Sequence, residues 1–195
     1  LSAAAGGTVA ALLTLYQYGK ADLSMALNGA LGGLVAITAG CAFVTPISSL
    51  VIGAAAGTLI VIAVPFFDRL RADDPVGAIA VHGVCGTFGT LAVGIFAQQG
   101  GLLYGGGVHL LLIQLLGVTA VGLWGFGATY ALFSLLKATV GIRVTEEEEL
   151  VGLDLSEHGI SAYTDMEYPL MQRMPQTLPV MEKSLQLDEE TVSPI

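Results

Sequence analysis

The feature that most constrains this chain is a histidine in the middle of a long apolar stretch. No charged residue occurs from Pro75 to Ala97, and a helix of that length, rising about 1.5 Å per residue, can cross a hydrocarbon core roughly 30 Å thick. His82 would then lie near mid-depth. Because ionisable groups inside a membrane are mostly functional, His82 is a candidate site residue. The alternative is a histidine that is hydrogen-bonded inside a helix bundle.

The start of this segment carries a helix signal. Asp74 can accept hydrogen bonds from unpaired backbone N–H groups, and Pro75 suits the first helical position because it has no N–H to leave unpaired. Helical spacing then gives His82 a face of mostly small residues, where another helix or a ligand can approach the backbone. That face comprises Ala78, His82, Gly86, Gly89 and Val93.

Composition and charge divide the chain into two regions. Hydrophobic residues make up 54% and charged residues 12% of the sequence, which is typical of a membrane protein and not of a soluble domain. Residues 1–140 hold four basic and four acidic residues, so the net charge of −9 lies in residues 141–195, with three basic and twelve acidic residues. We expect a transmembrane helical region followed by a solvated acidic tail with no attraction to nucleic acid.

Five apolar segments are long enough for about five membrane crossings. They cover residues 1–18, 24–43, 47–67, 75–97 and 108–138. Basic residues lie only in every second connection, at the end of the fifth segment and after it. Up to residue 143 they are Lys20, Arg69, Arg71, Lys137 and Arg143. The positive-inside rule makes that side cytoplasmic, so the first helix runs inward and the C-terminus lies in the cytoplasm.

Small and polar residues within the segments predict close helix packing. Glycine pairs form candidate packing seams at Gly29 and Gly33, at Gly53 and Gly57, and at Gly122 and Gly125. The amide of Asn28 and the hydroxyl of Thr38 need hydrogen-bond partners in lipid. Interhelical hydrogen bonding satisfies that need, and support of a polar path is the alternative interpretation.

Three motifs, in order along the chain, resemble the ammonium transporter family (Amt/Mep/Rh). They are LNGALGGLVAITAGC from Leu27 to Cys41, DDPVGAIAVHGVCGTFG from Asp73 to Gly89, and GIRVTEEEELVGLDLSEHGISAY from Gly141 to Tyr163. The resemblance implies an all-α membrane protein with the eleven-helix ammonium transporter fold. We expect this chain to be a fragment without the first six helices, holding part of the second inverted repeat, the long final helix and the cytoplasmic tail.

The resemblance also implies a function and a set of site residues. It implies ammonium or ammonia transport through a hydrophobic pore, with His82 as one of two pore histidines and a neutral imidazole acting as proton relay. Positions in the second helix flank the conduction path in this family, so Asn28 and Thr38 are candidate pore-supporting residues. Ala78, on the face of His82, is a third candidate. Asp74 is expected to serve as a helix cap and structural anchor. The implied assembly is a homotrimer in the plasma (inner) membrane that serves nitrogen uptake.

The tail motif resembles a cytoplasmic element that docks onto the neighbouring subunit in this family. The resemblance places Gly152, Asp154, His158 and Gly159 in that regulatory element, and puts Ser156 where some relatives carry a regulatory phosphorylated threonine. In bacterial relatives the cytoplasmic regulator is a PII-type signalling protein, which makes such a protein a candidate partner here.

Two alternatives to transport remain open, and one class is disfavoured. The same motifs fit an ammonium sensor that signals to a cytoplasmic partner through the tail, and they fit a truncated product with no activity of its own. An enzyme is not expected, because no nucleophile, base and orienting group occur together and no phosphate loop or metal-ligand spacing appears. We therefore expect no cofactor and no metal.

Overall fold

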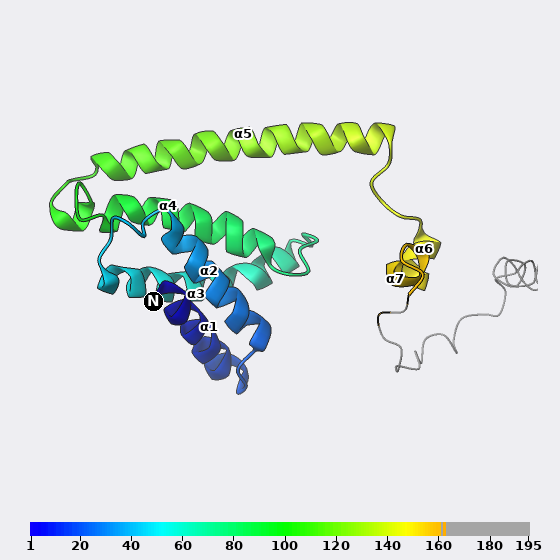
Figure 1. The fold of residues 1–195 in the computed structure, drawn as a ribbon, viewed down its shortest axis with the longest axis horizontal. Helices are drawn as coiled ribbons and strands as arrows, with labels where there is room; N and C mark the ends of the chain where they lie inside the picture. The colour runs from blue at the N-terminus through cyan, green and yellow to red at the C-terminus, as the bar shows by residue number, and fades with distance from the viewer. Residues whose placement is uncertain (161, 163–195) are drawn as a thin grey trace, which may run out of the picture. The chain divides into compact units, whose positions relative to one another are not determined.

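The computed structural model describes residues 1–160 and 162, and this part of the chain is mostly helical and has no strand. The long helices are α1 (Ser2–Tyr18), α2 (Leu23–Thr38), α3 (Pro46–Arg69), α4 (Cys85–Phe96) and α5 (His109–Thr139). The short elements are the π-helix η1 (Ile79–Val84), the 3-10 helix η2 (Leu102–Tyr104), α6 (Glu146–Val151) and α7 (Leu153–Ser156). Figure 1 shows η1 running directly into α4. The predicted helical class is confirmed.

Two compact units make up the chain, Leu1–Ala138 and Thr139–Ile195. In the described residues, three helices are long and apolar enough to cross a membrane: α3, η1 together with α4, and α5. The helices α1 and α2 have 17 and 16 residues, close to the lower limit for a crossing. Five crossings therefore stay a prediction.

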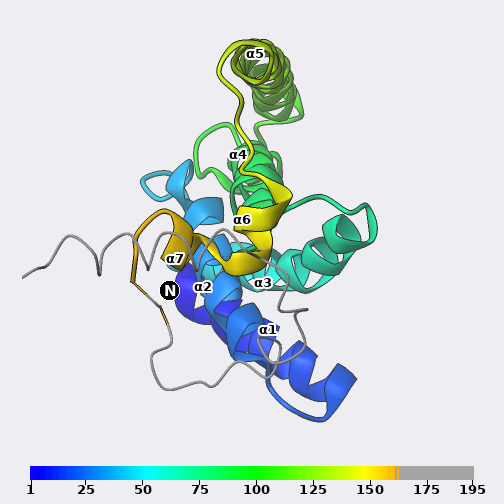
Figure 2. The same cartoon turned by 90° about the vertical axis from the view of Figure 1, so that its right-hand side faces the viewer.

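Close backbone contact joins α1 to α2 and α3 (Figure 2). The buried residues of α1 recur every four positions and form one stripe. They are Ser2, Gly6, Ala10 and Thr14. The hydroxyl of Ser2 donates a hydrogen bond of 2.7 Å to the carbonyl oxygen of Gly33 on α2. Small residues on one face let the backbones approach this closely, as helix association in a membrane requires.

The glycines of α2 and α3 form the other side of this contact. A Cβ atom built on Gly29, Gly33, Gly53 or Gly57 would lie closer than 3.0 Å to atoms of α1. The two predicted packing seams on these helices are therefore confirmed. The pair on α5 differs, because nothing lies within 4 Å of a Cβ on Gly122 or Gly125.

The apolar core of the first unit lies between α2, α3, η1 and α4. Its fully buried side chains include Ile52 and Ile60 of α3 and Cys85 at the start of α4. By contrast, no residue of α5 is buried, although α5 begins against α4 where Leu111 meets Gly94. The core therefore fixes η1 and α4 against α2 and α3.

The segment that carries His82 starts later than the sequence predicted. Pro75 and Val76 lie in a turn, Gly77 has a φ of 75°, and the helical backbone begins at Ala78 and Ile79. Pro75 is therefore not the first helical residue. The physical reason is the left-handed conformation at Gly77, which glycine adopts at little cost and which no helix can contain.

Candidate functional site

His82 lies on a π-helical turn between two parts of the core. Ala80 and Val81 precede it and are buried, and Cys85 follows it and is buried, whereas His82 is exposed. The N–H of Cys85 donates to the carbonyl of Ala80, five residues earlier, as in a π-helix. Such turns are rare and occur frequently at functional sites.

The π-helical turn changes which residues share a face with His82. Each residue of a π-helix turns through a smaller angle than in an α-helix, so the helical wheel of α4 does not extend back to residue 82. Gly89 and Val93, predicted on the same face, are instead buried, and a Cβ on Gly89 would collide with the backbone of Ala36. That part of the predicted face was wrong. Ala78 is exposed at the start of η1.

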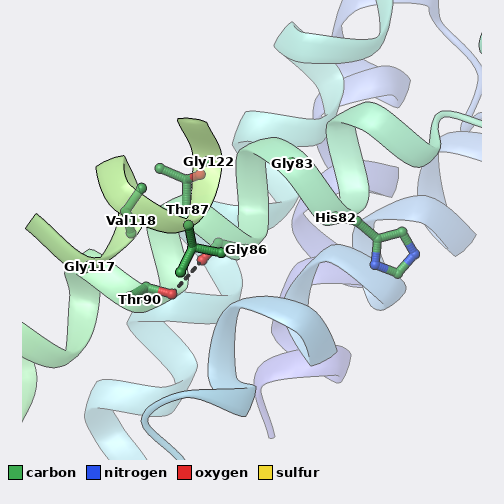
Figure 3. A pocket seen from close by; sticks show the side chains of 9 residues that line it. His82, Gly83, Gly86, Thr87, Thr90, Gly117, Val118 and Gly122 are labelled. Carbon is green, nitrogen blue, oxygen red and sulfur yellow. Dashed lines mark hydrogen bonds between the residues drawn. The ribbon is translucent and has the colours of Figure 1, made fainter. Parts of the chain in front are cut away.

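A groove of about 440 Å³ lies beside His82, between the η1–α4 segment and α5. Its lining comes from His82, Gly83, Gly86, Thr87 and Thr90 on one side and from Gly117, Val118, Val121 and Gly122 on α5. Figure 3 shows the imidazole of His82 standing apart from the two threonines and Val118. The hydroxyl of Thr90 donates a hydrogen bond of 3.0 Å to the carbonyl of Gly86. The groove is therefore mostly apolar, with His82 as its ionisable residue.

The start of η1 is held by two side chains that the sequence singled out. The carboxylate of Asp74 accepts from the N–H groups of Ala78 and Ile79 at 2.7 and 2.8 Å. The side-chain amide of Asn28 on α2 donates a hydrogen bond of 3.0 Å to the carbonyl of Val76. Asp74, Asn28 and Ala78 therefore meet at the entry to the turn that carries His82.

Thr38 is not part of this arrangement. It ends α2, whereas Asn28 lies in the second turn of that helix. Its hydroxyl donates a hydrogen bond of 2.8 Å to the carbonyl of Leu34, one turn earlier in the same helix. The groove residues Gly83, Thr87 and Thr90 were not predicted, because α-helical spacing gives no signal for a π-helical turn.

Gly77→Ala is expected to destabilise the protein by more than the matched change Gly19→Ala. Both glycines have positive φ, at 75° and 72°, so both substitutions carry a backbone cost of about 1–2 kcal/mol. Only at Gly77 would the new Cβ meet a neighbour, 2.9 Å from the amide nitrogen of Asn28. Thermal unfolding of the two variants measures the difference. Equal losses would contradict a tight contact at Gly77.

In the second unit, α6 starts with a capping box. The hydroxyl of Thr145 accepts from the N–H of Glu148, and the N–H of Thr145 donates 2.8 Å to the carboxylate of Glu148. Arg143 donates to both carboxylate oxygens of Glu149 at 2.9 Å. That ion pair is exposed and contributes little by itself.

The predicted tail residues lie in one short segment that comprises α7 and the residues on either side of it. The carboxylate of Asp154 accepts a hydrogen bond of 2.8 Å from the N–H of Ala162. The hydroxyl of Ser156 donates a hydrogen bond of 3.2 Å to the carbonyl of Gly152. Gly152 and Gly159 have positive φ, and both Ser156 and His158 are exposed. The Asp154 carboxylate thus closes the loop from residue 154 to residue 162.

Acid is expected to open this tail. The Thr145 N–H, with its hydroxyl, lowers the pKa of Glu148, and the Ala162 N–H lowers the pKa of Asp154. A lowered pKa stabilises the folded form above the ordinary carboxyl pKa of about 4, and this contribution is lost as pH falls through the lowered value. Hydrogen exchange should show that the Thr145 and Ala162 amides are protected from exchange at neutral pH and lose this protection only below about pH 4.

Glu148→Gln is the matched control, since its side chain cannot ionise and protection at Thr145 should no longer respond to acid. Loss of protection on raising the pH, or no response to acid in the unchanged protein, would contradict the expectation.

Apolar helices of membrane-spanning length, packed through glycines, define the class of multi-pass membrane proteins. Within that class the chain belongs to the Ammonium Transporter Family, whose sequence model matches residues 1–163. The expected family is therefore confirmed.

Relatives and solved structures agree with this assignment. Ammonium transporter Amt2 of Archaeoglobus fulgidus is 43% identical over 190 residues, which are 89% of this chain and 40% of the relative. Putative ammonium transporter 2 of Caenorhabditis elegans is 33% identical over 193 residues, with coverage of 89% and 38%. These relatives are described as transporters and not as enzymes. The chain spans about two fifths of their length.

Two structures show the same fold. One described as a sensor Amt protein has a TM-score of 0.74 at 43% identity, covering 80% of this chain and 39% of that one. Candida albicans Mep2 has a TM-score of 0.69 at 28% identity, covering 89% and 41%.

Proposed function

We propose that the protein containing this chain transports ammonium or ammonia across the membrane through a hydrophobic pore, with His82 as a proton relay. The observation that carries the proposal is the π-helical turn. It presents His82 beside an apolar groove while its neighbours Val81 and Cys85 stay buried. Membership of the Ammonium Transporter Family supplies the substrate class.

The chemistry follows from the cost of moving a small cation into an apolar environment. An ammonium ion must either have its hydration replaced or lose its proton. A neutral imidazole can accept a proton at one nitrogen and donate one at the other, at pH values near neutrality. His82 would thus take part in moving the proton, while the apolar groove residues leave ammonia as the species that passes.

The remaining architecture belongs to the same proposal. The chain would cross the membrane five times as the last five helices of an eleven-helix fold, with α1 and α2 as short crossings. Residues 141–195 would lie in the cytoplasm of a homotrimer in the plasma membrane, with one pore in each subunit. Asn28, Asp74 and Ala78 would support the pore from the start of η1.

Ammonium-elicited current across membranes containing the whole protein tests the proposal. We expect a saturable current or uptake that favours ammonium over potassium and is absent from protein-free membranes. A protein that reaches the membrane in folded form and carries neither would contradict transport.

A second candidate function is ammonium sensing through the tail, possible in the same fold. It is favoured by the likeness to the structure described as a sensor Amt protein, at 43% identity. Deleting residues 141–195 separates the two functions. A transporter should lose rate or regulation, whereas a sensor should lose signalling to its cytoplasmic partner, for which a PII-type protein is the candidate, while uptake persists.

A further inference from the structure

The turn before η1 is held by a side chain from another helix. The amide nitrogen of Asn28 on α2 donates to the carbonyl oxygen of Val76 at 3.0 Å, although 48 residues separate the two in sequence. Val76 lies six residues before His82. This contact therefore ties α2 to the backbone that leads into the π-helical turn.

The space around this turn leaves little freedom. A Cβ on Gly77 would lie 2.9 Å from the Asn28 amide nitrogen and 3.2 Å from Val64 of α3. Gly77 is thus enclosed by α2 on one side and α3 on the other, whereas Pro75 and Val76 are exposed. A shift of the Asn28 side chain would therefore displace the backbone at residues 76 and 77.

From this turn the constraint passes to His82 through backbone hydrogen bonds. The carbonyl of Gly77 accepts from the N–H of Val81 at 3.0 Å, next to His82. At its other end, the π-helical turn is fixed by the burial of Cys85. The rotation of His82 therefore depends on two supports, the core after it and the Asn28 contact before it.

The contact also bears on which face His82 occupies. An α-helical turn would place residue 82 on the face of Gly89 and Val93, which packs against α2. The π-helical turn places it beside the groove instead. Holding Val76 and Gly77 in their turn opposes rewinding of this segment as an α-helix.

We propose that Asn28 is a positioning residue for His82, acting through the carbonyl of Val76 to hold the π-helical turn that places His82 at the edge of the groove. This inference rests on the proposed function of His82. In this proposal the side-chain N–H of Asn28 on α2 fixes the orientation of His82 on η1.

Two substitutions remove the donor in different ways. Asn28→Leu keeps the branched shape and the number of heavy atoms without a charge, and Asn28→Asp keeps the shape but replaces the amide with a carboxylate. An effect that both share belongs to the lost donor and not to added charge. Thr38→Val is the matched control on α2, because the Thr38 hydroxyl bonds only within its own helix.

The experiment measures ammonium and potassium currents of the whole protein, normalised to folded protein in the membrane, across a range of pH. We expect both Asn28 variants to lose about fivefold in the ammonium-to-potassium ratio, the scale of one hydrogen bond, and to shift the pH dependence of the current. Thr38→Val should keep both unchanged.

His82→Ala in the same measurement separates the proposed role of His82 from the proposed role of Asn28. If His82→Ala alters selectivity and the Asn28 variants do not, the positioning role is overturned. Loss of folded protein in both Asn28 variants, with unchanged selectivity in what remains, assigns Asn28 a purely structural role and also overturns it. If His82→Ala itself conducts and selects like the unchanged protein, the proposed relay role of His82 fails, and the positioning role of Asn28 fails with it.

Discussion

Asp74→Ala should lower ammonium transport about tenfold, with little change in the amount of protein in the membrane. The Asp74 carboxylate accepts from two consecutive N–H groups, those of Ala78 and Ile79, at 2.7 and 2.8 Å. Loss of such a cap costs up to about 2 kcal/mol, and about 1.4 kcal/mol corresponds to a factor of ten. Because the cap lies at the start of η1, that cost falls on the turn that presents His82. Uptake normalised to membrane protein measures the effect.

Asp22→Ala is the matched control for this prediction. Asp22 caps α2 by accepting from the N–H of Met25 at 2.9 Å, and in the described residues its side chain makes no hydrogen bond to η1. It should cost similar stability and leave transport within about twofold, since cap losses of this kind are typically near 1 kcal/mol. Equal loss of transport in the two variants would show that Asp74 acts only on overall stability.

Gly6→Val is expected to destabilise the helical bundle by about 3 kcal/mol or more. A Cβ on Gly6 would collide with the carbonyl oxygen of Gly29 and lie 3.1 Å from that of Gly53. Both neighbours are backbone atoms, so neither can move aside as a flexible side chain would. The helices α1, α2 and α3 would have to separate, with loss of the Ser2–Gly33 hydrogen bond. Thermal unfolding in detergent measures the loss.

Ala4→Val provides the comparison on the exposed face of the same helix. It adds similar bulk where no helix packs in the described residues, and surface changes of this kind stay within about 0.5 kcal/mol. If both variants unfold at the same temperature, the glycine stripe is not the close contact described above.

Sequence periodicity predicted the packing of the first three helices well because glycine spacing has a direct steric meaning. Gly29 and Gly33, like Gly53 and Gly57, lie where the backbone of α1 approaches. The same rule does not apply to Gly122 and Gly125, since no atom of the described residues lies within 4 Å of a Cβ built on either. A spacing pattern shows that a face can accept a helix, and it does not show which helix does so.

The site itself was only partly predictable. The residue types His82, Asp74 and Asn28 were singled out, because a polar side chain in an apolar segment needs a partner. The π-helical turn was not, because a helical wheel assumes one fixed angle per residue and a single wider turn shifts every residue before it. For that reason Gly89 and Val93 were placed wrongly beside His82, while Gly83, Thr87 and Thr90 were missed.

In the tail, the acidic run from Glu146 to Glu149 indicated only a solvated segment. Its capping box depends on Thr145 and Glu148 being three residues apart. That pattern is visible in the sequence, whereas the closure of the loop by Asp154 onto the Ala162 N–H is a contact over eight residues that no local rule predicts. The predicted docking role of this loop stays a prediction.

The most direct test of the account is the ammonium-elicited current of the whole protein compared with that of His82→Ala, each with its selectivity over potassium. We predict that the substitution abolishes the current or its selectivity, because it removes the imidazole that we propose as the proton relay. An unchanged current with unchanged selectivity would contradict the account, and would leave His82 an exposed histidine with no part in conduction.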